Sequence, residues 1–174
     1  MSSASREKTL ILMRHSKAEE GIGKADHDRE LSSRGRRDAT AAGGWLREEG
    51  LLPDLVICST AVRTRQTWEA AVKGGAQTEF LEYRKSVYQG GPTALVETVR
   101  EDAGDMTTVL VIGHNPTMAE VASRLTDGQG STMAHEALAK GFATSGLAIL
   151  RYAGDWTDLD FGSCDLARFH VSRA

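Results

Sequence analysis

The sequence predicts a single three-layer α/β/α domain with a mostly parallel central sheet. Short apolar runs alternate along the chain with longer segments in which apolar residues recur at helical spacing. This alternation is typical of helices that pack on both faces of a sheet. The runs are almost continuously apolar, which indicates strands buried on both faces. Near the carboxyl end, two apolar runs follow each other without a helical segment between them, so we expect the last strands to be antiparallel.

The composition is that of an ordinary globular domain spanning residues 1–174, with 40% hydrophobic and 26% charged residues. The net charge of -3 does not favour a nucleic-acid partner. No apolar run approaches the ~20 residues needed to cross a bilayer, and the polar start of the chain lacks a signal peptide. We therefore expect a cytoplasmic monomer without membrane contact, a flexible N-terminus over 1–8, and reduced core cysteines at Cys58 and Cys164.

The first half of the chain predicts three strands and two helices. The first strand covers the five residues 9–13 and runs directly into Arg14 and His15, and a long polar loop follows over 19–33. A helix capped by Ser32 or Ser33 comes next, with one buried face formed by Ala39, Ala42, Gly43 and Leu46. Further along, we expect a strand over 54–58, a helix over 61–72 and a strand over 76–81.

The second half predicts two more helices and the end of the sheet. A helix follows the Gly-Gly-Pro segment 90–92, and the strongest strand pattern covers 108–112. The next helix starts after Pro116, a residue that is favourable in a first turn. Segment 128–140 is polar and mixed and receives no assignment. A strand over 147–152, a turn at 154–155 and a run over 156–161 predict a terminal antiparallel hairpin.

Residues that bind anions or transfer protons follow three of these strands. Arg14 and His15 follow the first strand, Ser59 and Arg63 follow the second, and His114 precedes a helix after the strand over 108–112. If the three strands are adjacent and parallel, these side chains meet at one edge of the sheet, where ligands bind in open α/β sheets. Two guanidinium groups, two imidazoles and a helix N-terminus suit a phosphoryl group.

Phosphoryl transfer through histidine fits this set better than a metal site. The arginines would repel a cation, and neither a cysteine nor a second carboxylate is spaced to complete a coordination sphere. A neutral imidazole is a competent nucleophile at neutral pH, and the other groups can stabilise the charge on the equatorial oxygens. Water would then hydrolyse the phosphohistidine, so we expect no metal and no cofactor.

Four ordered segments resemble the histidine phosphatase superfamily, which includes phosphoglycerate mutases and acid phosphatases. In this superfamily, they are most similar to the small SixA-type phosphohistidine phosphatases. The segments are Leu12-Met13-Arg14-His15-Ser16-Lys17-Ala18, Asp28-Arg29-Glu30-Leu31-Ser32-Ser33-Arg34-Gly35, Ser59-Thr60-Ala61-Val62-Arg63-Thr64-Arg65-Gln66-Thr67 and Val111-Ile112-Gly113-His114-Asn115-Pro116. Ser16 stands where the signature of the superfamily has glycine, a difference that matters only if the backbone there needs a positive φ.

The resemblance implies that His15 is the phosphorylated nucleophile and that Arg14, Arg63 and His114 hold the phosphoryl oxygens. It also makes Glu82, after the third strand, a candidate general acid. Three further side chains could bind substrate, and each has a plainer alternative. Ser59 could simply cap its helix, while Lys17 and Arg29 could be solvated residues of the loop. His27, His135 and His170 have no motif context, so we expect them to be surface or structural residues.

The resemblance leaves three alternatives for the function. A chain of 174 residues has little length for a lid, which favours a phosphorylated protein, in particular a phosphohistidine protein, as the substrate. The alternative is a small-molecule phosphomonoesterase or a mutase of the same superfamily that acts on a small phosphoester. A second alternative is a weakly catalytic phosphate-binding protein, although the presence of all four pocket residues argues against it.

Overall fold

The computed structural model describes residues 7–174. Its strands are β1 (Lys8–Arg14), β2 (Leu55–Ser59), β3 (Phe80–Arg84), β4 (Thr108–Gly113), β5 (Thr126–Gly130), β6 (Gly146–Tyr152) and β7 (Cys164–Val171). Its α-helices are α1 (Ser33–Glu48), α2 (Val62–Gly74), α3 (Lys85–Gln89), α4 (Pro92–Asp102), α5 (Thr117–Leu125) and α6 (Thr132–Ala139). Two 3₁₀ helices, η1 (Asp26–Asp28) and η2 (Trp156–Asp158), lie in loops.

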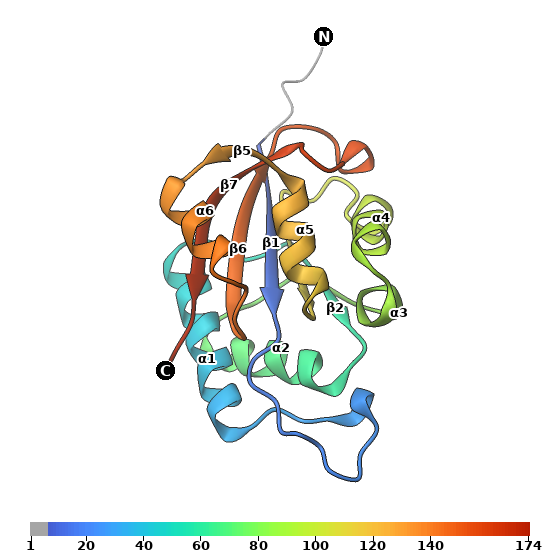
Figure 1. Cartoon of the computed structure of the whole chain (residues 1–174), viewed down its shortest axis with the longest axis vertical. Helices are drawn as coiled ribbons and strands as arrows, with labels where there is room; N and C mark the ends of the chain where they lie inside the picture. The colour runs from blue at the N-terminus through green and yellow to red at the C-terminus, as the bar shows by residue number, and fades with distance from the viewer. Residues whose placement is uncertain (1–6) are drawn as a thin grey trace.

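The seven strands form one mixed sheet in the order β3-β2-β4-β1-β6-β7-β5 (Figure 1). Strands β3, β2, β4 and β1 are parallel to one another, whereas β6 is antiparallel to both β1 and β7. The parallel strands β1 to β4 therefore come first along the chain, β5 is parallel to β7, and β6 takes part in both antiparallel pairs of strands. The predicted fold class is confirmed.

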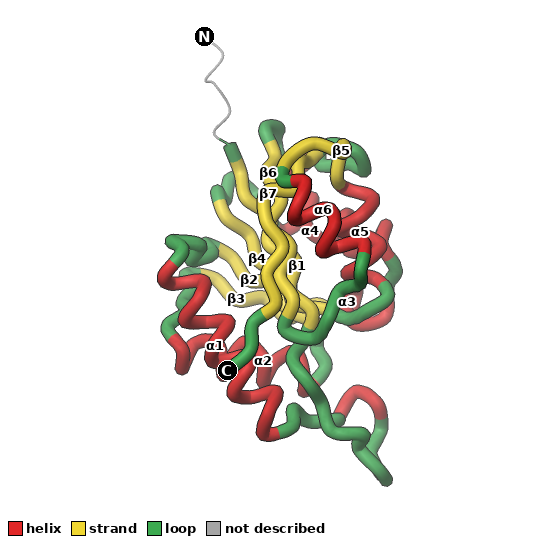
Figure 2. Tube along the Cα trace, turned by 60° about the vertical axis from the view of Figure 1, so that its left-hand side comes forward, coloured by secondary structure: helices red, strands yellow, loops and turns green. Residues whose placement is uncertain are grey.

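Helices cover both faces of the sheet. Helices α1 and α2 lie together on one face, while α3, α4 and α5 lie on the other (Figures 1 and 2). Two clusters of buried apolar side chains fill the spaces between these layers. The strands β1, β2 and β4 contribute alternate residues to the two clusters, so Leu10 and Leu12 belong to one and Ile11 and Met13 to the other. Both faces of these strands are thus buried, as their apolar sequences require.

The predicted buried face of α1 is confirmed and explains how closely α1 approaches α2. Ala39, Ala42, Gly43 and Leu46 are buried, and the Ser32 hydroxyl caps the helix by accepting the Gly35 N–H at 3.0 Å. A Cβ added to Gly43 would lie 1.8 Å from the carbonyl oxygen of Ala71 in α2. The small residue therefore permits backbone contact between the two helices.

Two strand predictions were wrong in position. The third strand was expected over 76–81, but β3 begins at Phe80; it is a partly exposed edge strand that pairs only with β2, so its apolar pattern is weak. The run 156–161 was expected to form the last strand. Instead, Trp156 lies in η2, fills the core with 1% of its surface exposed, and donates its indole N–H to the carbonyl of Met106. The strand that follows β6 and forms the antiparallel hairpin with it is β7, which begins at Cys164.

The start of the chain and segment 128–140 are more regular in structure than the sequence indicated. Lys8 is a buried residue of β1 whose Nζ donates to the carbonyl of Gly154 at 2.6 Å, so the expected flexible N-terminus over 1–8 is wrong at this residue. Residues 1–6 lie outside the described residues. The unassigned segment forms the end of β5 and then α6. Cys58 and Cys164 are buried free thiols, as expected. Between residues 7 and 174, no helix is long and apolar enough to cross a membrane.

Candidate active site

The strand register brings the predicted site residues to one edge of the sheet. Arg14, the last residue of β1, is aligned with Gly113, the last residue of β4, and β2 lies on the far side of β4. The residues that follow these strands therefore meet, and the ring centroids of His15 and His114 are 5.3 Å apart. The expectation that adjacent parallel strands gather these side chains is confirmed.

His15 is buried, with 9% of its surface exposed, and a single hydrogen bond determines its tautomer. Its Nδ1 lies 2.8 Å from the carbonyl oxygen of Ser16, and because a carbonyl can only accept, Nδ1 carries the proton. Nε2 is then the nitrogen with the free lone pair. Burial, with smaller effects of Arg63 and Arg14, lowers the His15 pKa to about 4. The ring is consequently neutral at pH 7 and suited to nucleophilic attack.

The two arginines present unused donors in the same place. Arg14 donates from Nη1 to the carbonyl of Phe142 at 3.0 Å, and burial lowers its pKa. Arg63, almost fully buried, donates from Nη1 and Nη2 to the backbone and carboxylate of Asp26. The Nε atoms of both arginines are buried without a hydrogen-bond partner among the described residues. Buried donors of this kind are costly unless a ligand satisfies them, and phosphoryl oxygens match guanidinium geometry.

His114 is held by Ser59, which is fully buried at the end of β2. The Ser59 hydroxyl accepts the Ala61 N–H at 3.2 Å and lies 2.7 Å from Nε2 of His114. When this hydroxyl gives its own proton to Nε2, the imidazole proton resides on Nδ1, which is buried and without a partner among the described residues. Burial, the neighbouring His15 and Arg63 lower the His114 pKa to about 3. Ser59 thus both caps its turn and orients His114.

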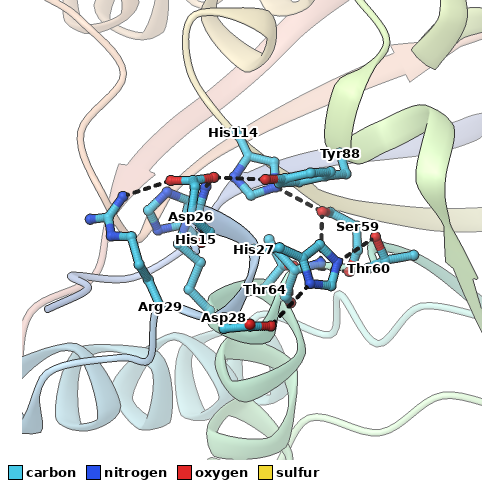
Figure 3. A network of polar contacts seen from close by, with 12 residues as sticks. His15, Asp26, His27, Asp28, Arg29, Ser59, Thr60, Thr64, Tyr88 and His114 are labelled. Carbon is cyan, nitrogen blue, oxygen red and sulfur yellow. Dashed lines mark hydrogen bonds and ion pairs between the residues drawn. The ribbon is translucent and has the colours of Figure 1, made fainter. Parts of the chain in front are cut away.

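A network that the sequence did not predict lies beside these residues (Figure 3). Asp26 in η1 accepts hydrogen bonds from Tyr88 at 2.8 Å, from Arg29 at 3.1 Å and from Arg63 at 3.1 Å. These bonds, of which the Tyr88 bond has the largest effect, lower its pKa to about 2. The Tyr88 ring makes edge contacts with the rings of His114 and His27, and the ring centroids are 5.5 Å and 4.9 Å apart, respectively. His27, which was expected to be a surface or structural residue, therefore packs against a member of this network.

The remaining predicted substrate residues are distributed unevenly. Arg29 belongs to this network, because it contacts Asp26, and its charge contributes to the low pKa of His15. Lys17 is exposed and lines a surface pocket together with other residues of the 17–34 region, none of which belongs to the cluster described above. The long loop after β1 thus delivers Arg29 and Asp26 to the cluster but leaves Lys17 at its margin.

Glu82, the candidate general acid, lies outside the cluster. It is aligned with Ile57 in the middle of β2 and contacts Arg84, whose Nη1 is 3.3 Å from its carboxylate. Arg84 in turn binds Asp102 at the carboxyl end of α4. Because Arg84 is aligned with Ser59 at the end of β2, Glu82 lies two residues before that end, with its carboxylate paired to Arg84.

Two further observations bear on the sequence predictions. Ser145 is the only non-glycine residue with a positive φ within 7–174, so Ser16 occupies the place of the signature glycine with an ordinary backbone conformation. The part of the chain that the structure describes also contains no group of three or more His, Cys, Asp or Glu side chains that could hold a metal ion.

Comparisons with known proteins identify the family. Residues 10–85 match the family model described as the histidine phosphatase superfamily (branch 1). An uncharacterized protein of Mycobacterium tuberculosis is 40% identical to this chain over 163 residues, which cover 92% of this chain and 100% of the relative. The chain belongs to the histidine phosphatase superfamily.

Solved structures of the histidine phosphatase superfamily agree with this fold. A candidate phosphohistidine phosphatase SixA from Nakamurella multipartitia has a TM-score of 0.85 and 36% identity, covering 99% of this chain and 100% of that one. A second candidate SixA, from Agrobacterium tumefaciens, has a TM-score of 0.75 and 28% identity, covering 94% and 98%. The resemblance seen in the sequence motifs is therefore confirmed over nearly the whole chain.

Proposed function

We propose that the protein is a phosphatase that forms a phosphohistidine on His15 and that its substrates are proteins phosphorylated on histidine. The state of His15 carries the proposal. Nδ1 keeps its proton and donates it in a hydrogen bond to the Ser16 carbonyl, so Nε2 is left as the nucleophile. Burial keeps the ring neutral. Superfamily membership and the SixA names of two similar structures support the same chemistry.

In the first step, Nε2 of His15 attacks phosphorus and forms a P–N bond while the bond to the leaving group breaks. Arg14, Arg63 and His114 hold the phosphoryl oxygens with their buried, otherwise unpartnered nitrogen atoms. The leaving group takes a proton from solvent. A histidine leaving group needs little assistance from an acid, and we therefore assign no step to Glu82. Asp26, whose pKa lies near 2, stays ionised and keeps Arg63 in place.

In the second step, water attacks phosphorus, the P–N bond breaks, and inorganic phosphate leaves with the electron pair returned to Nε2. A water proton is released to solvent, so the enzyme returns to its starting state. No step uses a metal ion or an organic cofactor, as the sequence predicts.

The connections around the site support a protein substrate. Only two helices, α3 and α4, with 5 and 11 residues, lie between β3 and β4, so this connection carries no domain-sized insertion. Such a site can accept a phosphate displayed on a protein side chain. The monomeric state and cytoplasmic location expected from the sequence belong to this proposal as well.

The test measures phosphate release from a phosphohistidine-carrying protein and from an aryl phosphate, with EDTA present, for the wild type and for His15→Ala. We expect release by the wild type, faster from the phosphohistidine protein, and loss of at least a thousandfold in the variant. Rapid quenching with alkali should trap an acid-labile phosphate on the wild type but not on His15→Ala.

Each alternative gives a different result. Efficient release from the aryl phosphate alone would assign the protein to small-molecule phosphomonoesters, and transfer within a substrate without release would assign it to the mutases. Equal release by the wild type and His15→Ala would refute the nucleophile, whereas activity lost with EDTA and restored by a metal ion would refute the metal-free mechanism.

A further inference from the structure

Ser145 combines three unusual properties next to the candidate nucleophile. It has a φ of 61°, in the left-handed region, whereas no other non-glycine residue within 7–174 has a positive φ. It is fully buried, and it directly precedes β6, the antiparallel neighbour of β1. A non-glycine residue in this conformation costs free energy, so its persistence points to a requirement for its side chain.

Ser145 contacts Arg14, which is the last residue of β1, and the two residues that follow it. Its backbone N–H is shared between the carbonyl oxygens of Arg14 at 3.2 Å and His15 at 3.3 Å. Its hydroxyl lies 2.5 Å from the hydroxyl of Ser16, which is also fully buried. In the other direction, the Ser145 carbonyl accepts the Ser172 N–H at 3.1 Å, which ties the residue to the segment after β7. Ser145 thus joins the turn after β1 to a fixed part of the fold.

The bond between the two serines lies close to the group that determines the His15 tautomer. The Ser16 N–H donates to Thr67 in α2 at 3.1 Å, and the Ser16 hydroxyl is held by Ser145. With both groups fixed, the Ser16 carbonyl is directed toward Nδ1 of His15 at 2.8 Å. Loss of the Ser145 hydroxyl would leave the buried Ser16 hydroxyl unpaired and release this constraint.

We propose that Ser145 is a positioning residue, which acts through Ser16 to hold the Ser16 carbonyl against Nδ1 of His15 and so keeps Nε2 available for attack. The proposal rests on the phosphohistidine chemistry proposed for His15. It also gives Ser16, which replaces the signature glycine, a specific use: its hydroxyl is the partner that Ser145 requires.

Ser145→Gly isolates the hydroxyl. Glycine adopts a φ of 61° without strain and keeps the backbone N–H that binds Arg14 and His15, so the variant should fold. Because a small misplacement of the nucleophile is costly, we expect kcat to fall about tenfold to a hundredfold with KM changed less than threefold. Ser163→Ala, which removes a serine hydroxyl that bonds to Asp160 instead, is the control and should retain full activity.

A double-mutant cycle tests whether Ser145 acts through Ser16. We expect Ser16→Ala to lower kcat by a similar factor, and Ser16→Ala combined with Ser145→Gly to be no slower than the slower single variant. Independent effects would multiply instead. A multiplicative loss, or full activity in Ser145→Gly, would overturn the proposal.

The tautomer can be read without any activity. Two-bond ¹⁵N–¹H correlation spectra of the His15 ring should show a proton on Nδ1 alone in the wild type, and a mixture of tautomers in Ser145→Gly. A pure Nδ1–H ring in Ser145→Gly would refute the positioning role. If Ser145→Gly showed this mixture of tautomers but the wild type had no phosphatase activity, the proposed function would fail while the positioning role of Ser145 stood.

Discussion

The low pKa values of His15 and His114, the two histidines of the candidate active site, make the stability of the protein sensitive to acid. An unfolded histidine binds a proton near pH 6.5, whereas burial lowers the pKa of His15 to about 4. Between these values the unfolded chain binds more protons than the folded one, so the stability contributed by His15 is present above pH 6.5 and is lost as the pH falls toward 4. His114, with a pKa lowered to about 3, acts in the same direction.

We predict that His15 alone accounts for about 2 kcal/mol of the free energy of unfolding lost between pH 7 and pH 5. Urea titrations at both values should show a smaller loss for His15→Ala than for the wild type. With an aryl phosphate, kcat/KM of the wild type should stay constant down to pH 5 and decline near pH 4. A decline centred near pH 6.5 would show that His15 has an ordinary pKa.

Some residues of the candidate site could be predicted from the sequence, and others could not. Arg14, His15, Arg63 and His114 follow buried strands or lie within one helical turn of them, so the strand order alone brings them together. Asp26 and Tyr88 meet across 62 positions through a loop and a short helix, and their bond depends on a loop conformation that no periodic pattern encodes. Ser145 likewise had no sequence signal, because its role arises from its φ and its burial.

At the scale of elements, the crossing of α1 and α2 positions Arg63, and it depends on one glycine. We predict that Gly43→Ala lowers the free energy of unfolding by at least about 2 kcal/mol, because the new Cβ would meet the Ala71 backbone and the helices must separate. Gly44→Ala is the matched control, with its Cβ 3.5 Å from the Gly74 carbonyl, and should stabilise the protein by up to about 1 kcal/mol.

Urea unfolding of the two variants measures both effects. Equal stability of Gly43→Ala and Gly44→Ala would contradict the close contact between the helices. Helix α1 was predictable because small and apolar residues recur along it at helical spacing. The edge strand β3 was misplaced because only one neighbour and a partly exposed surface constrain its sequence. The last strand was misplaced because Trp156, a single large side chain that fills the core, was interpreted as part of an apolar run.

For the whole molecule, the strand order places the candidate nucleophile directly after a strand that has a partner on both sides. β1 pairs with β4 on one side and with β6 on the other along nearly its whole length. The loop after it has few backbone hydrogen bonds, such as Glu19 to Glu30 and Lys24 to Gly21. We predict that the amides of 10–13 exchange with deuterium only on global unfolding, and those of 20–25 at least a thousandfold faster.

Hydrogen–deuterium exchange followed by mass spectrometry measures this difference, and comparable rates in the two segments would contradict it.

The difference in stability between β1 and the loop after it affects how a bulky substrate would enter the site. Asp26 and Arg29 belong to the loop that is predicted to open first, while His15 directly follows the strand that is predicted to open last. Under the proposed function, a phosphorylated protein would enter by displacing this loop in a brief local opening, while Nε2 of His15 keeps its position.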